Sequence, residues 1–416
     1  MSLERVLHYV SLDGAGGVEQ QFVEFVQTAR RLQDVEHAVV ACGRQVHPLL
    51  RSRLEAADVP LRFEKYVGPL KLPKWPSSLR CGRQRRLIEW HRPDVVLIWN
   101  RLRDSLDTLA GAGAEHCVYW ERGASWFAEE TVAKRRFLAM VPAILCNSHA
   151  AKRMLELRWG YAGQLKIVHN ALRPSLLPST AARPRRLPLD RAPILGMVAR
   201  LEPIKGVALA IHAVAELRGV GMEVRLRIAG DGSEIAGLRR LAADLAVDDA
   251  VEFSGLVADM GAFYGGIDLL VHPALREPFG QIVIEAAAYG IPAVVSAVDG
   301  LVEVVAQGET GICVKPTIEL KRYRELGGGD RGLPPFVYNP ERDAIDEPKL
   351  VDPGDLAVAV KGLLECSLEY ERISANAIAA VGKHFVFEDH VRTVLDAIAR
   401  YATNGCLEGE ALDRLR

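Results

Sequence analysis

Several features that would assign the chain to a special class of protein are missing. Its 416 residues include 52 Lys and Arg against 53 Asp and Glu, so the formal net charge is only −1. Binding nucleic acid over a broad surface needs a net basic protein, and the balanced charge argues against it. No apolar run is long enough to cross a membrane, because the smoothest one, 281–298, is interrupted by Glu285, Gly290 and Pro292. A strand-like run begins directly after residue 5, so we expect no secretory signal.

Cysteine is scarce as well. The seven cysteines are scattered singly with no C-x-x-C pair, which excludes the usual zinc spacings and a framework of paired disulfides. We therefore expect a reducing, cytoplasmic location. What the chain does contain is 49% apolar and 25% charged residues, the composition of an ordinary globular protein rather than a disordered one. At roughly 100–200 residues per domain, its length favours two domains.

Short apolar runs alternate with helical patterns along both halves of the chain. This alternation predicts parallel sheets with helices on both faces. A proline- and arginine-rich stretch without periodicity separates the two halves at about 174–191. The apolar runs lie at 5–10, 38–42, 94–99, 117–120, 143–146 and 165–168 before this stretch, and at 194–198, 224–229, 251–253, 269–272, 293–296 and 311–314 after it.

The predicted fold class is α/β, with two doubly wound, Rossmann-like domains facing a central cleft beyond the carboxyl ends of their strands. We expect the first domain at residues 1–175, a linker at 176–192, the second domain at 193–385, and a final helix and tail at 386–416. Within the second domain, residues 317–351 show neither helical nor strand periodicity. A loop this long is usually functional or disordered, so we expect a disordered or passive insertion, or a lid over the cleft.

Two glycine- and cation-bearing clusters lie at strand–helix junctions. The first, 13–19, contains three glycines that let the backbone approach a phosphate, or simply turn tightly, at the start of a helix. It is not a dinucleotide fingerprint, because Glu19 stands where the last glycine is required. The second cluster, 200–206, carries Arg200 and Lys205 on one loop, which suits either a diphosphate clamp or a solvated basic loop.

Two further clusters supply carboxylates. Glu277 lies in a loop and Glu285 about one turn into the following helix, with Pro-Phe-Gly after the first of them. This spacing lets both carboxylates reach hydroxyls of one sugar nucleotide, while backbone N–H groups of 279–282 face its phosphates. In the last cluster, 299–303, Glu303 lies in a first helical turn, where it is either functional or only favoured by the helix dipole.

Together the clusters resemble the large retaining glycosyltransferases of the GT-B fold, family four (glycosyl transferases group 1). The resemblance runs from Val6 to about Thr403 and is densest in the second half of the chain. The matching pieces follow the family's order: 14–19, Asn170, Arg200 with Lys205, 229–232, 253–255, Glu277 with Glu285, 299–303 and 310–312.

This resemblance implies a role for each matching residue. Arg200 and Lys205 would hold the donor diphosphate and stabilise the leaving nucleotide, and with Glu277 they would form the catalytic set. Glu277 would contact the donor sugar, and Glu285 the nucleotide ribose. The last helix, 387–401, would cross back to the first domain. The other donor-binding residues would surround the phosphates, the sugar and the base: Gly16, Gly17, Gly255, Val257, Phe279, Gly280, Gln281 and Ile282.

The chain also departs from the family. Many relatives carry a histidine that faces the sugar after the strand at 117–120, where this chain reads Trp-Glu-Arg-Gly. Glu121 and Arg122 are therefore candidates for the acceptor or donor-sugar side, together with Asn170. Asp299 stands where a glycine is common, and 317–351 replaces a loop that is usually short.

Metal, partners and alternatives complete the prediction. A metal ion could also stabilise the leaving diphosphate, but the sequence has no Asp-x-Asp motif, so we expect metal-independent transfer without a cofactor. The expected partners are a nucleotide-sugar donor and a glycan or glycolipid acceptor in bacterial polysaccharide or lipopolysaccharide synthesis. Residues 62–92 combine nine Lys and Arg with two tryptophans, which predicts either solvated charge or contact with the anionic inner face of the cytoplasmic membrane. Rival functions are a sugar-nucleotide hydrolase or epimerase, and a non-catalytic sugar-nucleotide-binding subunit.

Overall fold

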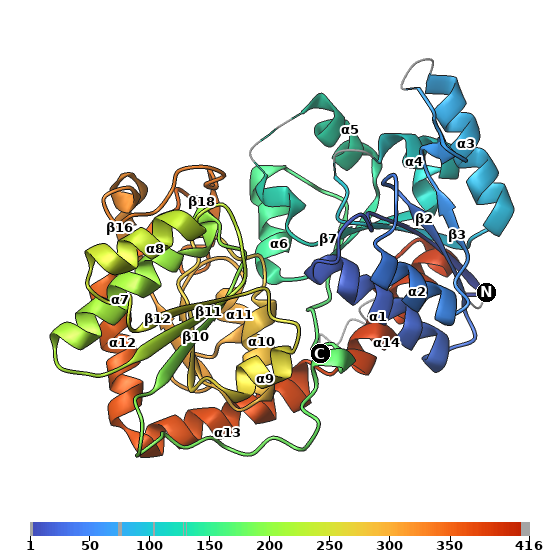
Figure 1. The fold of residues 1–416 in the computed structure, drawn as a ribbon. Helices are drawn as coiled ribbons and strands as arrows, with labels where there is room; N and C mark the ends of the chain where they lie inside the picture. Colours follow the sequence, from blue (N-terminus) through green and yellow to red (C-terminus); the bar gives the residue numbers. More distant parts are fainter. Residues whose placement is uncertain (1–2, 74–76, 103–104, 128, 130, 409–416) are drawn as a thin grey trace, which may run out of the picture. The chain divides into compact units, whose positions relative to one another are not determined.

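The structure is a computed structural model that describes residues 3–73, 77–102, 105–127, 129 and 131–408. Its internal contacts divide the chain into unit 1, Met1–His169 with Phe387–Arg416, and unit 2, Asn170–Val386. Each unit is built around its own parallel sheet (Figure 1), as the alternation of apolar runs and helical patterns predicts.

The sheet of unit 1 has seven strands in the order β3-β2-β1-β6-β7-β8-β9, and every neighbouring pair is parallel. Its central strands are buried because helices cover both faces, and this is why they read as continuous apolar runs. The short strand β3 was not predicted, since three residues around an arginine show no period. The strands are β1 (Arg5–Val10), β2 (Glu36–Ala41), β3 (Leu61–Phe63), β6 (Val95–Trp99), β7 (Cys117–Glu121), β8 (Ala143–Cys146) and β9 (Gln164–Ile167).

The helices of unit 1 include the last helix of the chain. Its apolar face buries Val391, Val394 and Ile398, and it packs against α1 and β6. The chain therefore returns to unit 1 at its end, as predicted. A two-stranded hairpin of β4 (Tyr66–Val67) and β5 (Leu70–Lys71) precedes α3. The helices are α1 (Gly17–Leu32), α2 (Pro48–Ala56), α3 (Ser77–His91), α4 (Leu106–Ala112), α5 (Val132–Met140), α6 (His149–Arg153) and α14 (Phe387–Asn404).

Unit 2 repeats the architecture with a six-stranded parallel sheet in the order β12-β11-β10-β13-β14-β15. The order reverses between β10 and β13, which are neighbours, so the topological switch point of this sheet lies there. The strands are β10 (Ile194–Val198), β11 (Arg225–Ala229), β12 (Val251–Gly255), β13 (Leu269–His272), β14 (Ala293–Ser296) and β15 (Gly311–Val314). The helices are α7 (Val207–Gly219), α8 (Ile235–Asp244), α9 (Met260–Gly265), α10 (Gln281–Ala288), α11 (Leu301–Val304), α12 (Pro353–Glu365) and α13 (Ser367–His384).

The proline- and arginine-rich stretch at 176–192 lies within unit 2, and the boundary between the units falls at His169 rather than at residue 175. Its arginines bind the body of unit 2. Arg185 donates to the carbonyl of Ile267 at 2.9 Å, and Arg191 forms an ion pair with Asp268 at 2.6 Å. A stretch without helical or strand period can thus still be anchored by side-chain contacts.

The inserted segment 317–351 is ordered, so the expectation of disorder is wrong. Strand β16 (Pro316–Glu319) pairs with β19 (Lys349–Val351), and β17 (Val337–Asn339) with β18 (Ala344–Asp346), both antiparallel. Tyr323, Val337 and Leu350 are buried in the hydrophobic core of unit 2. Strands of three or four residues are too short to show a period, although a few buried side chains are enough to fix them.

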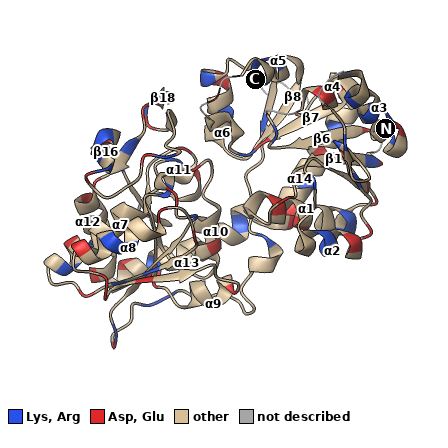
Figure 2. Ribbon diagram, turned by 45° about the horizontal axis from the view of Figure 1, so that its top comes forward, with Lys and Arg blue, Asp and Glu red and all other residues tan. Residues whose placement is uncertain are grey.

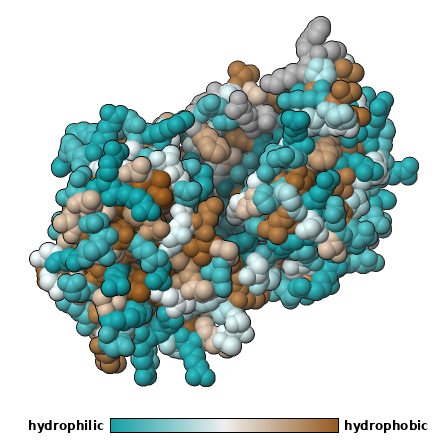
Figure 3. All heavy atoms as spheres, viewed as in Figure 1, coloured by the Kyte–Doolittle hydropathy of each residue, from teal (hydrophilic) through white to brown (hydrophobic). Residues whose placement is uncertain are grey.

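Other expectations can be checked over the described part of the chain. All seven cysteines are free, as their scattered positions predict. None of the described helices combines the length and the apolar character needed to cross a bilayer. On the face shown in Figure 3, hydrophobic atoms form small groups among hydrophilic ones in both units.

Candidate functional site

The polar residues of the site gather at the switch point of the unit 2 sheet. Strand β10 leads into a loop that ends in the one-turn helix η5 (Pro203–Lys205), and β13 leads into the loop that carries Glu277. Because β10 and β13 are parallel neighbours, their carboxyl ends and both loops lie side by side.

A close backbone approach joins these two loops. Gly206 has φ +69°, and a Cβ atom there would lie 2.0 Å from the carbonyl oxygen of Pro273. Only glycine therefore fits at this position. The contact brings Lys205 next to the loop that follows β13.

Glu277 is held by two cationic or polar side chains. Its Oε2 accepts a hydrogen bond from Lys205 Nζ at 2.7 Å and lies 3.2 Å from His272 Nε2. Burial alone would raise the pKa of Glu277, but Lys205 and the hydrogen bond from His272 hold it well below its usual range. No described residue donates to Oε1 of Glu277. The cluster thus presents one open oxygen on an ionised carboxylate.

His272, the last residue of β13, was not predicted as a site residue. It is 1% exposed, and burial lowers its pKa against the opposing effect of Glu277. Because an ionised carboxylate can only accept, Nε2 carries the proton of the hydrogen bond to Glu277. Its Nδ1 is buried without a hydrogen-bond partner in the described part of the chain. The only sequence signal was its position at the carboxyl end of a central strand.

The main chain around Glu277 is also anchored. Its N–H donates to Oδ2 of Asp299 at 3.0 Å, and the N–H of Gly300 donates to the Glu277 carbonyl at 3.1 Å. Asp299 follows β14, the neighbour of β13, so three adjacent strand ends contribute to the cluster.

Glu285, in α10, shares no hydrogen-bond partner with Glu277 among the residues that the structure describes. It is 5% exposed, and Oε2 accepts a hydrogen bond from the Tyr264 hydroxyl at 2.9 Å, while Oε1 lies 3.5 Å from Arg173. Burial raises its pKa, against the opposing effect of Arg173. The structure therefore turns the carboxylate of Glu285 inward. Tyr264 and Arg173 were not predicted, because nothing in the local sequence relates them to Glu285.

The other predicted donor-side residues of unit 2 surround these loops. Arg200 is solvent-exposed and forms an ion pair with Glu202 at 2.8 Å, whereas the described side-chain partners of Glu277 are Lys205 and His272. Gly280 caps α10 with φ +108°, and Phe279 beside it is buried against Phe385. Gln281 Nε2 donates to the carbonyl of Ala171 at 3.1 Å. Ile282 in the first turn of α10, and Gly255 and Val257 at the end of β12, are half-buried.

In unit 1 the glycine loop lies where it was expected. Gly16 caps α1 and Gly17 is its first residue, and both are exposed at the helix N-terminus. Glu121 is fully buried at the end of β7. Its Oε1 accepts the N–H groups of Gly123 at 2.6 Å and Ser125 at 3.0 Å, while Tyr119 donates to Oε2. Its carboxylate thus stabilises the turn after β7.

Arg122, the first residue after β7, has fewer hydrogen-bond partners than Glu121. It is 7% exposed, contacts Gln21, and lies over the rings of Trp99 and Trp120 at 5.5 and 5.2 Å. Its Nε and Nη1 have no hydrogen-bond partner among the described residues, and burial lowers its pKa to about 9. Buried donors of this kind are rare unless a ligand or water satisfies them. Asn170, at the start of unit 2, is 6% exposed with its Oδ1 likewise unpartnered in the described chain.

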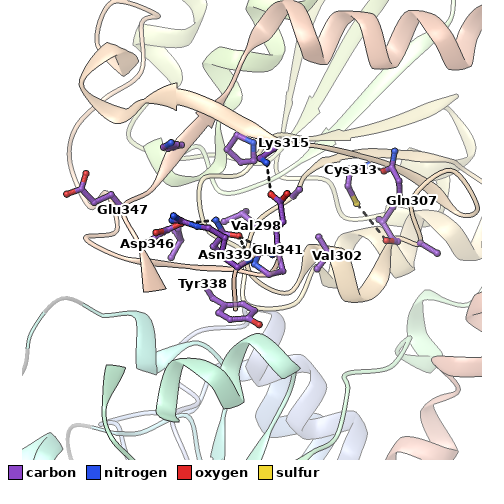
Figure 4. A pocket seen from close by; sticks show the side chains of 18 residues that line it. Val298, Val302, Gln307, Cys313, Lys315, Tyr338, Asn339, Glu341, Asp346 and Glu347 are labelled. Carbon is purple, nitrogen blue, oxygen red and sulfur yellow. Dashed lines mark hydrogen bonds and ion pairs between the residues drawn. The ribbon is translucent and has the colours of Figure 1, made fainter. Parts of the chain in front are cut away.

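A cavity of about 860 Å³ lies in unit 2, and Val302 of the predicted 299–303 cluster lines it, whereas Lys205, Glu277 and Glu285 do not. It lies between residues in and around α11 and the hairpin of β17 and β18 and opens to solvent, so the inserted segment forms one of its walls (Figure 4). Valines 298, 302 and 305 line its apolar side. The other side carries charged pairs such as Lys315 with Glu341, at 2.6 Å.

The described residues contain no group of three His, Cys, Asp or Glu side chains that could hold a metal ion.

Comparisons with the sequences of known proteins identify the family of this chain. Residues 15–176 match Glycosyltransferase Family 4, and residues 179–325 match Glycosyl transferases group 1. The lipopolysaccharide core biosynthesis glycosyltransferase LpsE of Rhizobium meliloti is 31% identical over 304 residues, which cover 72% of this chain and 81% of LpsE. The chain belongs to the group 1 glycosyltransferases. A D-inositol 3-phosphate glycosyltransferase of Acidothermus cellulolyticus is 30% identical, but the matched part of this glycosyltransferase spans only 48% of that protein.

Solved structures agree on the fold of this glycosyltransferase. A glycosyltransferase from Rickettsia africae has a TM-score of 0.73 at 15% identity, with 97% of this chain and 99% of that chain covered. Anabaena HepE in complex with UDP-glucose has a TM-score of 0.67 at 18% identity, with 96% and 99% covered. The predicted GT-B architecture of two Rossmann-like domains is thereby confirmed.

Proposed function

We propose that this glycosyltransferase moves a sugar from a nucleoside-diphosphate sugar to a hydroxyl group of a glycan or glycolipid, with retention of configuration and without a metal ion. The observation that carries the proposal is the cluster of Lys205, Glu277 and His272 at the switch point of the unit 2 sheet. Ligands of doubly wound sheets bind at this point. The free oxygen of the Glu277 carboxylate suits the hydroxyl groups of a sugar, and the ammonium group of Lys205 suits an anionic diphosphate.

Charge stabilisation is the main chemical task of such a site. When the bond between sugar and nucleotide breaks, negative charge grows on the diphosphate, and nearby cations stabilise it. Lys205 and the exposed Arg200 supply two cations from one loop. Glu277 Oε1 would accept hydrogen bonds from the donor sugar, and its negative charge would favour the cationic character that develops on the sugar.

The remaining donor contacts follow from backbone geometry. The N–H groups of residues 280–282, at the N-terminus of α10, suit the phosphates, whereas the N–H of Val283 already donates to the Gly280 carbonyl at 3.0 Å. Gly16 and Gly17 offer similar groups at the start of α1. Gly255, the last residue of β12, and Val257, two residues further on, would border the base. Contact between Glu285 and the ribose requires that its carboxylate exchange Tyr264 or Arg173 for the ligand.

Arg122 is the strongest candidate on the acceptor side. Its two unpartnered nitrogens are buried in unit 1, where an anionic or hydroxyl group of the acceptor would satisfy them. Glu121 would act by fixing the turn that carries Arg122, and Asn170 would offer its unpartnered Oδ1 to a hydroxyl. The similarity to LpsE, a lipopolysaccharide core enzyme, supports a bacterial cell-surface glycan or glycolipid as the acceptor.

Residues 62–92 would bring the enzyme to an anionic membrane that holds such an acceptor. Arg85 and Arg86 are exposed on α3, whose basic residues are blue in Figure 2, and Leu70 and Leu79 are 73% and 49% exposed. Arg83, in contrast, donates to the carbonyl of Phe63 at 3.0 Å. Lys74, Trp75 and Pro76, which belong to the same predicted patch, lie outside the described residues.

The function is tested by measuring nucleotide release from a panel of UDP-, GDP-, ADP- and CMP-sugars, with and without lipopolysaccharide core acceptors. A transferase releases nucleotide from one donor and forms a glycoconjugate, whose anomeric configuration by proton NMR matches that of the donor. An inverted product would exclude retention. Free sugar or an epimer as the only product would favour a hydrolase or an epimerase. Thermal stabilisation by one donor without turnover on any acceptor would favour a binding subunit.

A further inference from the structure

Asp299 joins three segments of unit 2 that are distant in the sequence. It is fully buried after β14, and its Oδ2 accepts the N–H of Glu277 at 3.0 Å. Its Oδ1 accepts the N–H of Tyr338, in strand β17 of the inserted segment, at 2.7 Å. The N–H of Asp299 donates in turn to the carbonyl of Tyr338 at 3.1 Å. One carboxylate thus connects the loop of Glu277 to the inserted hairpin.

The backbone of Asp299 is in an unfavourable conformation. Its φ is +48°, in the left-handed region, where glycine is favoured and aspartate is tolerated at a cost in free energy. Glycine would remove this cost but would leave the N–H groups of Glu277 and Tyr338 without their acceptor. Hydrogen bonds to a charged group are stronger than those between neutral groups, so the two bonds favour aspartate in spite of its backbone conformation.

The hairpin at the other end of this connection is well defined. Tyr338 pairs with Ile345 across the hairpin, and the Tyr338 hydroxyl donates to Asp343 at 2.8 Å. Asn339 donates to Asp346 at 2.7 Å. The hairpin also borders the cavity beside α11, and Tyr338 and Asn339 line that cavity (Figure 4). Beside this open space, the bonds through Asp299 connect the hairpin to the loop of Glu277.

We propose that Asp299 is a positioning residue through which the β17–β18 hairpin holds the main chain of Glu277, and thereby its carboxylate, against Lys205 and His272. The inserted segment then helps to orient the carboxylate of Glu277 toward the donor sugar, rather than being a passive insertion. The expected loss of turnover rests on the proposed function. The expected change in hydrogen exchange at the Glu277 amide is independent of it.

Asp299→Gly is the direct test, since glycine accepts the backbone conformation and removes only the carboxylate. We expect amide exchange at Glu277 and at Tyr338 to accelerate at least about tenfold, as measured by hydrogen exchange with single-amide fragmentation. With the donor that wild type uses, kcat should fall about ten- to a hundredfold while the donor KM changes less, because a misplaced carboxylate impairs the transition state most.

Asp268→Ala is the matched control. Asp268 is 2% exposed and accepts the N–H of Ile194 at 2.8 Å, so it is also a buried carboxylate bonded to the backbone of unit 2. It lies directly before the amino end of β13, whereas Glu277 lies beyond the carboxyl end of the same strand. Its replacement should lower stability while leaving both the exchange of the Glu277 amide and kcat unchanged.

A second pair of variants tests the connection from the side of the hairpin. Tyr338→Pro and Tyr338→Ala both remove the aromatic side chain, but only proline also removes the N–H that Asp299 accepts. Exchange at Glu277 should therefore be faster in Tyr338→Pro than in Tyr338→Ala.

Wild-type exchange at Glu277 in both Asp299→Gly and Tyr338→Pro would overturn the proposal, as would an equal loss of kcat in Asp268→Ala. If wild type releases no nucleotide from any donor, the proposed function fails. The exchange rates then still decide whether Asp299 and the hairpin hold Glu277.

Discussion

The ion pair between Lys205 and Glu277 should contribute measurably to the stability of unit 2. Its atoms are 2.7 Å apart, and the side chains are 17% and 16% exposed. Removing one partner of a fully buried pair destabilises a protein by about 3–5 kcal/mol. Because this pair is partly exposed and His272 remains as a donor, we expect Lys205→Met to lower the free energy of unfolding by roughly 2–3 kcal/mol.

The assay has to report on unit 2 alone. All six tryptophans of the chain precede residue 170, so tryptophan fluorescence follows unit 1. Hydrogen exchange of peptides from β13 and α10 across a urea series gives the stability of unit 2 instead. We expect Lys205→Met combined with Glu277→Gln to lose less than the sum of the two single variants, with a coupling energy of about 1–2 kcal/mol. Additive losses would refute a direct ion pair.

Acidification provides an independent check of the same pair. The folded-state pKa of Glu277 is below the ordinary value of 4.5, so its stabilising contribution is complete above that value and is lost as the pH falls through the folded-state pKa. The stability difference between wild type and Glu277→Gln should therefore stay constant from neutral pH down to about 4.5 and shrink below it. A difference that already declines near pH 6 would contradict the assigned direction of the shift.

Three further outcomes follow from the site and the surface. Chelators should leave activity unchanged, whereas complete loss with rescue by Mg²⁺ would overturn metal-independent transfer. Arg122→Met should leave the thermal midpoint unchanged or raise it, since a buried cation with unpartnered donors is replaced by an apolar side chain, while turnover with the acceptor falls at least about tenfold. A lower midpoint with normal turnover would instead make Arg122 a packing residue. Replacing Arg85 and Arg86 by glutamine should weaken binding to anionic vesicles by about 2 kcal/mol, roughly 30-fold, and unchanged sedimentation would remove the membrane contact.

The sheets could be predicted from the sequence because their central strands, such as β1, β6, β13 and β14, are buried on both faces and therefore read as separate apolar runs. Strands such as β3 and β17 could not, since three residues carry no period and depend on neighbours far along the chain. The sequence predicts a disordered or passive insertion, or a lid, at 317–351, and the short strands of this segment were missed for this reason. Its strands are defined by pairing and by a few buried side chains, such as Leu350.

The site was predictable only in part. The loops that carry Lys205 and Glu277 were recognisable as motifs, but their direct contact depends on the pairing of β10 with β13, and their separation of 72 residues conceals it. The contact between Asp299 and Tyr338 spans 39 residues. It joins Asp299, which stands where the family commonly has glycine, to the inserted segment 317–351, which replaces a loop that is usually short. The inward orientation of Glu285 depends on Tyr264, which its own helix does not contain.

The central claim is that Glu277 acts on the donor sugar, and the most direct test is kcat/KM of Glu277→Ala with the donor that wild type uses. The matched control is Glu319→Gln, which removes a carboxylate from an exposed position of the same unit. We expect Glu277→Ala to lose at least about a hundredfold in kcat/KM with its circular dichroism spectrum intact, and the control to match wild type. Near-normal turnover of Glu277→Ala would contradict the account.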